Sequence, residues 1–301
     1  MHAKTKLLKA ELKLLRPVLT RQNNLQIARA AQDEAGKLMA SRKVAFEDIP
    51  MAGFEACYAT PQETMGEGVI LYLHGGGYTA GSLQYAKGFG SALAGQAGLR
   101  ALCVAYRLAP EHPYPAALED ALQAYRYLLA QGNAPGGILL CGESAGGGLC
   151  FALCLKLRDL GLPLPGGVAA ISPWVDLTLS GPSYTENAGK DPLLCREMLA
   201  YYVQCYAPGQ DPANPYISPL FGDLRGMPPS LLFAGGDELL LSEAQALHRA
   251  LLEAGVNSRL HVSEEMWHAY LLYGTEEGKK DMQAIIQFIR EMQACASREN
   301  G

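Results

Sequence analysis

The stretch LCGESAGGGLC, residues 140–150, sets one serine among glycines, between two apolar segments. Gly142 to Gly146 fit the pattern G-x-S-x-G, and the flanking residues predict a strand before it and a helix after it. In that context the pattern predicts a sharp turn that exposes the hydroxyl of Ser144 at the edge of a sheet. The positions two places before and after the serine must be glycine, because a side chain there would collide with the turn. Ser144 is therefore a candidate nucleophile.

Apolar strands and helical segments alternate on both sides of this turn. We expect strands at about 68–74, 99–106, 136–142, 167–173, 229–235 and 258–264, and helices at about 84–97, 115–131, 145–160, 242–254 and 277–296. Short apolar strands that alternate with helices are typical of a parallel sheet buried on both faces. A hairpin of two short strands is expected before them, at 43–61. The sequence thus predicts an α/β fold with a mostly parallel central sheet.

Two segments fall outside this alternation. Residues 1–45 predict two amphipathic helices, separated by Pro17 and the polar residues 20–24. A helical insertion at about 180–212 follows a strand, and the carboxyl ends of strands are where such sheets bind ligands. We therefore expect both segments to form a helical cap over the site, with residues 46–301 as the catalytic core.

Composition excludes several classes of function. The net charge is −5 and no block of like charge stands out, which argues against nucleic acid as a partner. No run approaches the roughly 20 apolar residues that a membrane span needs, and the N-terminus is too interrupted by charge for a signal peptide. The eight cysteines form no CxxC pair and lie largely in apolar runs, which indicates free thiols and no metal site. We expect a cytoplasmic protein without a membrane partner.

A second glycine cluster, HGGGY at 74–78, ends an earlier strand. Consecutive glycines let backbone N–H groups approach a substrate oxygen without hindrance from a side chain. The alternative, a phosphate loop, lacks the G-x-x-x-x-G-K-[ST] pattern. We expect an oxyanion hole formed by the amides of Gly75, Gly76 and Ala145.

A nucleophilic serine also needs a base and an acid. Of the six histidines, His268 in EEMWHAY lies after the serine and in the loop that follows the last predicted strand. The chain order serine, acid, histidine places the acid in the loop after the preceding strand, where GGDEL puts Asp237. Glu238 and Glu243 are rivals for this role. We expect a triad of Ser144, Asp237 and His268.

These motifs, with YRLAPEHPYPAALED (106–120) and SPWVDL (172–177), resemble those of the hormone-sensitive-lipase-like branch of the α/β-hydrolases, a family of bacterial carboxylesterases. The resemblance runs over almost the whole core. It implies the α/β-hydrolase fold, the same triad and oxyanion hole, and a helical cap built partly from the N-terminus. It also implies that no cofactor is needed and that esters of short acyl chains are preferred.

The sequence therefore predicts a serine carboxylesterase that hydrolyses small-molecule esters of short to medium acyl chains through an acyl-enzyme. An amidase or deacetylase with the same triad is the first alternative. A receptor that binds a small molecule on the same fold is the second, and the presence of His268 argues against it. Tyr78 and Glu143 are expected near the substrate pocket, with a packed core aromatic as the alternative for Tyr78. A homodimer through the edge strand at 258–264 is also expected.

Overall fold

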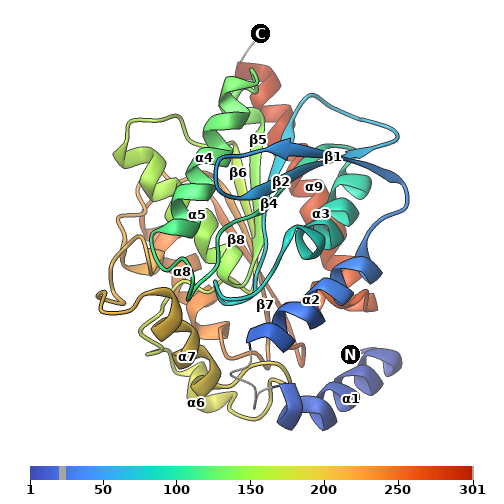
Figure 1. Cartoon of the computed structure of the whole chain (residues 1–301), viewed down its shortest axis with the longest axis vertical. Coiled ribbons are helices and arrows are strands. Elements are labelled where there is room, and N and C mark those ends of the chain that lie inside the picture. Colours follow the sequence, from blue (N-terminus) through green and yellow to red (C-terminus); the bar gives the residue numbers. More distant parts are fainter. Residues whose placement is uncertain (20–24, 300–301) are drawn as a thin grey trace.

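The computed structural model describes residues 1–19 and 25–299 and places their strands in one eight-stranded sheet (Figure 1). The strands are β1 Val44–Pro50, β2 Glu55–Pro61, β3 Val69–Leu73, β4 Arg100–Ala105, β5 Ile138–Glu143, β6 Gly167–Ile171, β7 Ser230–Gly235 and β8 Ser258–Ser263. Their order across the sheet is β1-β2-β4-β3-β5-β6-β7-β8. The β1–β2 and β2–β4 pairs are antiparallel, and every other neighbouring pair is parallel. The predicted hairpin and the mostly parallel sheet are both confirmed.

The central strands are continuous apolar runs because helices cover both of their faces. Every residue of β3, β5, β6 and β7 is buried. One apolar core includes residues of α4, α5 and α8, and a second includes residues of α3 and α9 (Figure 1). These helices span Leu83–Ala97 (α3), Ala116–Ala130 (α4), Ala145–Asp159 (α5), Leu241–Glu253 (α8) and Glu276–Glu299 (α9). The core therefore sits in two layers, and the loops at the carboxyl ends of the strands are free to build a site.

The segments outside the alternation gather at one end of the molecule, at the bottom of Figure 1. They form α1 Ala3–Leu19, α2 Leu25–Met39, α6 Ser183–Glu186 and α7 Arg196–Tyr206. Helix α1 continues past Pro17, where the sequence suggested a break, and the expected separator at 20–24 lies outside the described residues. The short helix α6 was not expected, and α7 begins five residues later than the pattern DPLLCREM suggests.

Helix α2 packs closely on α3 because two glycines meet. A Cβ on Gly36 of α2 would lie 2.6 Å from the Cα of Tyr85, and one on Gly88 of α3 would lie 2.8 Å from the Cα of Gly36. Arg29 fastens the same helix by donating to both carboxylate oxygens of Glu111 and to the carbonyl oxygen of Thr79 at 2.9 Å. Helix α2 is thus held against the core over much of its length.

We expect Gly36→Ala and Gly95→Ala to change stability in opposite directions. At Gly36 the new methyl meets backbone atoms of α3, which should destabilise the fold by about 1–3 kcal/mol. At Gly95, exposed on α3, the nearest atoms would be 3.5 Å away, so the gain in helix propensity should stabilise it by about 0.5–1 kcal/mol. Thermal unfolding of the two variants checks this, and equal shifts would contradict the close packing of α2 on α3.

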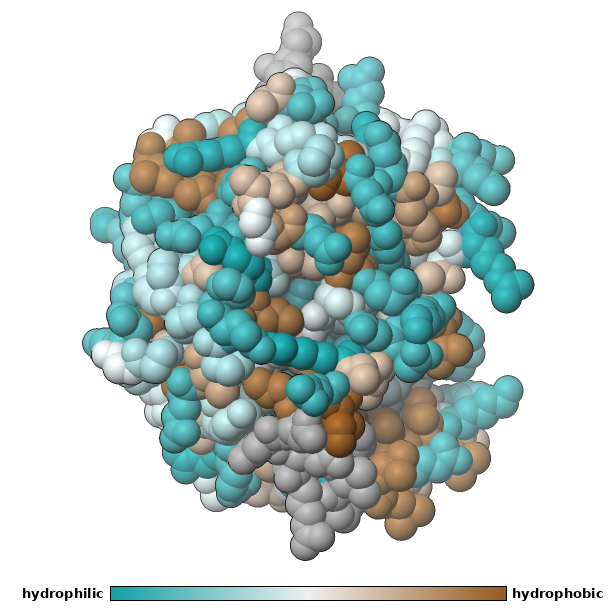
Figure 2. All heavy atoms as spheres, viewed as in Figure 1, coloured by the Kyte–Doolittle hydropathy of each residue, from teal (hydrophilic) through white to brown (hydrophobic). Residues whose placement is uncertain are grey.

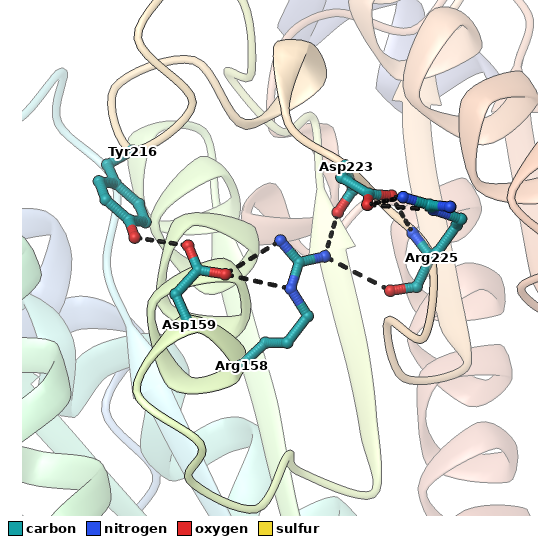
Figure 3. Close-up of polar contacts among 5 residues, drawn as sticks. All are labelled: Arg158, Asp159, Tyr216, Asp223 and Arg225. Atoms are coloured by element: carbon teal, nitrogen blue, oxygen red, sulfur yellow. Dashed lines mark hydrogen bonds and ion pairs between the residues drawn. The ribbon is translucent and has the colours of Figure 1, made fainter.

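A polar cluster ties the loop after α7 to the end of α5 (Figure 3). Arg158 donates to the carbonyl oxygens of Asp223 and Arg225 and pairs with Asp159 at 3.1 Å. The hydroxyl of Tyr216 donates to the other oxygen of Asp159 at 2.6 Å, and Arg225 pairs with Asp223. These contacts hold the chain on its return from the insertion to β7.

The expected homodimer would form through the last strand of the sheet. Strand β8 lies at one edge of the sheet, as the sequence predicts, and assembly through it stays a prediction. Among the residues that the structure describes, no helix is both long enough and apolar enough to cross a bilayer.

Candidate active site

Ser144 stands on the predicted turn, between the last residue of β5 and the first of α5. Its backbone lies at φ 54° and ψ −122°, outside the conformations that ordinary residues favour. A Cβ on Gly142 would lie 2.5 Å from the carbonyl oxygen of Gly146, and one on Gly146 would lie 2.6 Å from the carbonyl carbon of Leu73. Space therefore requires both glycines, and the strained turn brings Ser144 into the wall of a cavity.

Of the two glycine amides that the sequence suggests as oxyanion donors, the loop after β3 leaves Gly76 free but not Gly75. The N–H of Gly75 donates to Glu143 Oε1 at 2.6 Å, so this predicted oxyanion donor is already occupied. In the described part of the chain, the amides of Gly76 and Gly77 donate no hydrogen bond to the protein. The N–H of Ala145 opens helix α5 and has no carbonyl of its own helix to bind. The free donors are therefore Gly76, Gly77 and Ala145.

Glu143 is a buried carboxylate at the base of this loop. It accepts from the hydroxyl of Tyr72 at 2.6 Å as well as from Gly75. Burial raises the pKa of Glu143 to about 7, and these hydrogen bonds partly oppose the rise. Glu143 belongs to the cavity wall, as expected, but its oxygens are committed to holding the loop.

His268, in the loop after β8, lines the same cavity as Ser144. Burial lowers the pKa of its imidazole to about 3, which favours the neutral form that can accept a proton. Its Nδ1 has no hydrogen-bond partner among the described residues. A histidine base needs an acceptor at Nδ1 to fix its tautomer, so its acid partner must be sought nearby.

Asp237, the expected acid, is engaged elsewhere. Its Oδ2 accepts from the Nζ of Lys9, on helix α1, at 2.5 Å. In the described residues no hydrogen bond reaches His268 Nδ1, from Asp237 or from any other group. Among the described residues Asp237 therefore makes no hydrogen bond to His268 Nδ1, and one of its carboxylate oxygens is bound by the ammonium of Lys9.

The next residue, Glu238, has the surroundings that an acid partner requires. It is fully buried, and its Oε2 accepts from the hydroxyl of Ser172 at 2.6 Å and from the N–H of Gly235 at 2.9 Å. Ser172 Oγ in turn accepts from the N–H of Ala269, the residue after His268, at 3.0 Å. Glu238 Oε1 has no partner among the described residues, like Nδ1 of the histidine. One hydrogen bond between these two atoms would satisfy both.

Glu243, the other rival, supports the backbone. Its Oε2 accepts from the N–H groups of Val175 at 2.9 Å and Asp176 at 3.0 Å, and its Oε1 accepts from the hydroxyl of Tyr184. Burial raises the pKa of Glu243 to about 8. Both oxygens are occupied, so Glu243 is not available to the histidine.

The cavity that holds Ser144 and His268 has a volume of about 460 Å³ and a mainly apolar wall. The N-terminal helix α2 and the insertion that contains α7 supply much of that wall. They contribute Ala28, Ala31, Gln32, Ala35, Leu38 and Met39 from α2, and Leu193, Leu194, Met198, Leu199 and Tyr202 from α7 and the residues before it. Within residues 1–19 and 25–299, no group of three or more histidine, cysteine or acidic side chains could hold a metal ion.

Tyr78 lies in the core, away from this wall. Its ring is 1% exposed and stacks on that of Tyr206, with 3.8 Å between the centroids. It is not among the residues that line the cavity. The alternative given above, a packed core aromatic, describes Tyr78 better than a pocket residue.

The sequence predicts that the helices of residues 1–45 cover the site, but it does not show which residues of α2 line the cavity. Ala28, Ala31 and Ala35 recur at helical spacing, which is a signal for one face of a helix. Small residues at that spacing also occur where two helices simply pack closely, so the pattern does not identify a pocket. Nothing in the sequence around Tyr202 indicates that its ring lies over Gly77 and lines the cavity.

Known proteins resemble this chain in both sequence and structure. A model of a family with the α/β-hydrolase fold matches residues 70–272. The acetyl-hydrolase of Streptomyces hygroscopicus is 38% identical over 288 residues, which cover 93% of this chain and 96% of the relative.

Two crystal structures support the same relationship. An esterase from the bacterial hormone-sensitive lipase family has a TM-score of 0.89 and 36% identity, with 95% of this chain and 98% of that chain covered. A hormone-sensitive lipase from a metagenome library has a TM-score of 0.91 and 33% identity, with 96% and 98% covered. With the strand order and the serine turn described above, these similarities place the chain in the bacterial hormone-sensitive-lipase-like family of α/β-hydrolases, as a carboxylesterase-like serine hydrolase.

Proposed function

We propose that this protein hydrolyses carboxylic esters of short to medium acyl chains, with Ser144 as the nucleophile and His268 as the base. The observation that carries the proposal is that both side chains line one apolar cavity beside unoccupied backbone amides. A nucleophile, a neutral imidazole and free N–H donors at one point are the requirements of acyl transfer.

The proposed reaction has two halves. Ser144 Oγ attacks the ester carbonyl carbon while His268 takes its proton, and the oxyanion is bound by the amides of Gly76, Gly77 and Ala145. His268 then passes that proton to the departing alcohol, which leaves the acyl group on the serine. Water attacks the acyl-enzyme, gives a proton to His268, and the acid departs as the serine recovers its hydrogen.

For the acid we propose Glu238 in place of Asp237. Glu238 is buried beside the backbone of Ala269 with one oxygen free, whereas Asp237 is paired with Lys9. Burial raises the pKa of Glu238 to about 8, and a hydrogen bond from the imidazolium would favour its ionised form during the reaction.

The substrate class rests on the cavity and on one relative. A volume of about 460 Å³ lined by alanine, leucine and methionine suits a neutral acyl group of modest length. The relative from Streptomyces hygroscopicus is named an acetyl-hydrolase, and acetyl is the smallest of the acyl groups in question. The division into a cap, residues 1–45 with about 180–212, and a catalytic core belongs to the same proposal.

Hydrolysis of acetyl amides is a second candidate. The name acetyl-hydrolase does not distinguish an ester from an amide, and the same residues cleave both. Esters have the better leaving group, so esterase activity is the first expectation.

We expect the hydrolysis of p-nitrophenyl esters to be fast for acetate and butyrate and to fall steeply towards palmitate. The reason is that the cap helices α2 and α7 bound the cavity. Measuring kcat/KM along this series, with p-nitroacetanilide beside the acetate, tests both candidates. Rates that rise steadily to palmitate would contradict the short-chain proposal. Faster cleavage of the anilide than of the acetate would favour the amidase.

A further inference from the structure

Lys9 is a buried lysine on helix α1, whose other lysines, Lys4, Lys6 and Lys13, are exposed. Its side chain is only 7% exposed, and its Nζ donates to Asp237 Oδ2 at 2.5 Å and to the carbonyl oxygen of Glu265. Leu7, Leu14 and Leu15 of the same helix are exposed. Figure 2 shows brown, hydrophobic atoms at the lower right, where Figure 1 places α1. The outward leucines contribute nothing to docking, so the inward face must hold the helix.

The two acceptors of Lys9 belong to the two loops that carry the proposed acid and base. Asp237 immediately precedes Glu238, and Glu265 lies three residues before His268. The loops also bind each other, because the N–H of Asp237 donates to the carbonyl oxygen of Met266 at 2.9 Å. The ammonium of Lys9 therefore adds a second link between the loops, supplied by the cap.

The burial of Lys9 is unfavourable if either of its hydrogen bonds is missing. A buried ammonium is unfavourable unless its hydrogen bonds are made, so Lys9 can stay in this place only while both acceptors are present. The backbone at Glu265 has a φ of 60°, a conformation that a residue with a side chain rarely adopts. Its carbonyl is thus presented by a strained loop, and the lysine stabilises that arrangement.

Helix α1 has other polar anchors, and two of them reach a different part of the protein. The hydroxyl of Thr5 donates to Glu277 Oε2 at 2.7 Å, and the N–H of His2 donates to Glu277 Oε1 at 2.5 Å. Glu277 lies at the start of α9, outside the two loops. Thr5 and Lys9 therefore both fasten α1, and of these two anchors Lys9 is the one that binds the loops of the acid and the base. The N-terminal ammonium of Met1 adds an ion pair with the carboxylate of Glu265 at 3.7 Å.

We propose that Lys9 is a positioning residue for ester hydrolysis. By binding Asp237 and the carbonyl of Glu265, it holds the loops of Glu238 and His268 in the relative position that the triad requires. The inference rests on the triad proposed above. It assigns to the N-terminal helix a part in chemistry, beyond covering the cavity, and gives Asp237 the role of partner to the lysine. Lys9 lines no part of the cavity, so its effect falls on turnover and not on substrate binding.

The test compares Lys9→Met with Thr5→Val. Lys9→Met keeps an unbranched, flexible side chain that is one atom shorter and removes both hydrogen bonds, so we expect kcat for p-nitrophenyl butyrate to fall by about 10- to 100-fold, with KM nearly unchanged. Thr5→Val removes one anchor of the same helix and should leave kcat at the wild-type value. Lys9→Arg, which keeps the charge, should recover part of the loss. Equal kcat values for Lys9→Met and the wild type would overturn the proposal, as would equal losses in Lys9→Met and Thr5→Val.

A double-mutant cycle with Asp237→Asn separates this inference from the triad itself. If Asp237 serves Lys9, then Asp237→Asn should lose no more in kcat than Lys9→Met, and the double variant should lose the same factor as Lys9→Met alone. Losses that multiply in the double variant would overturn the role of Lys9. A loss in Asp237→Asn far deeper than in Lys9→Met would instead restore Asp237 as the acid, and so overturn the proposed triad. Circular dichroism and thermal unfolding establish that each variant is folded before its kinetics are compared.

Discussion

Replacing Ser144 with alanine is expected to lower kcat for ester hydrolysis by about 10⁶-fold. The serine stands on a backbone of φ 54° that its neighbouring glycines make possible, and it faces the cavity that also holds His268. Without its oxygen no acyl-enzyme forms, and only binding and the oxyanion amides remain to assist water. Alanine fits the same turn, so the loss should appear in the kinetics and not in the folding.

A covalent probe identifies the nucleophilic serine directly. A sulfonyl fluoride should add one adduct to the wild-type protein, on the peptide that contains Ser144, and none to the alanine variant. Ser230→Ala, at the amino end of β7, is the matched control, because that hydroxyl donates only to the carbonyl oxygen of Pro228. It should keep both turnover and labelling. Turnover that survives in Ser144→Ala, or an adduct on another serine, would show that the elbow serine is not the nucleophile.

Much of the fold could be predicted because its signals are local. The buried strands are short apolar runs, and each helix that covers them has its own periodicity, so most boundaries were correct to within two residues. The insertion was harder. Residues 191–195 continue the apolar pattern of α7, but the buried carboxylate of Asp191 accepts from the N–H groups of Leu193 and Leu194, which holds this stretch outside the helix.

The triad acid could not be fixed from the sequence, because Asp237 and Glu238 are adjacent on one loop. Which carboxylate turns inward depends on partners that come from distant parts of the chain. Ser172, 66 residues away, draws Glu238 inward, and Lys9, 228 residues away, binds Asp237. Spacing alone carries no information about either partner.

For a similar reason the sequence names Gly75 as an oxyanion donor, although its N–H is occupied. Three consecutive glycines offer three amides, and the sequence does not say which of them is taken. The carboxylate of Glu143, 68 residues further on, accepts from Gly75 and so leaves Gly76 and Gly77 free. Tyr78 follows the same glycines, yet it stacks on Tyr206 of the insertion, and that contact is also remote in sequence.

We expect Glu238→Gln to lower kcat by about 10³- to 10⁴-fold, the second-largest effect among these variants. Glutamine has the shape of glutamate, and its carbonyl oxygen can still accept from Ser172 Oγ and the N–H of Gly235. Its amide N–H then faces the histidine where a carboxylate oxygen was. Because Nδ1 must accept that hydrogen, the proton of the neutral ring moves to Nε2, the nitrogen that has to receive the proton of Ser144. The variant should therefore fold normally, but His268 should no longer accept the proton of Ser144.

Asp237→Asn is the matched control, one residue away, and should lose no more than Lys9→Met. A deeper loss in Asp237→Asn than in Glu238→Gln would assign the acid to Asp237. The pH dependence gives a second criterion. Burial raises the pKa of Glu238 to about 8, so its carboxyl becomes protonated as the pH falls below that value. Only the ionised form can stabilise the imidazolium, and glutamine has no ionised form. The ratio of wild-type to Glu238→Gln activity should therefore grow as the pH rises through the pKa of Glu238, and a ratio that stays flat from pH 6 to 9 would argue against this carboxylate as the partner of His268.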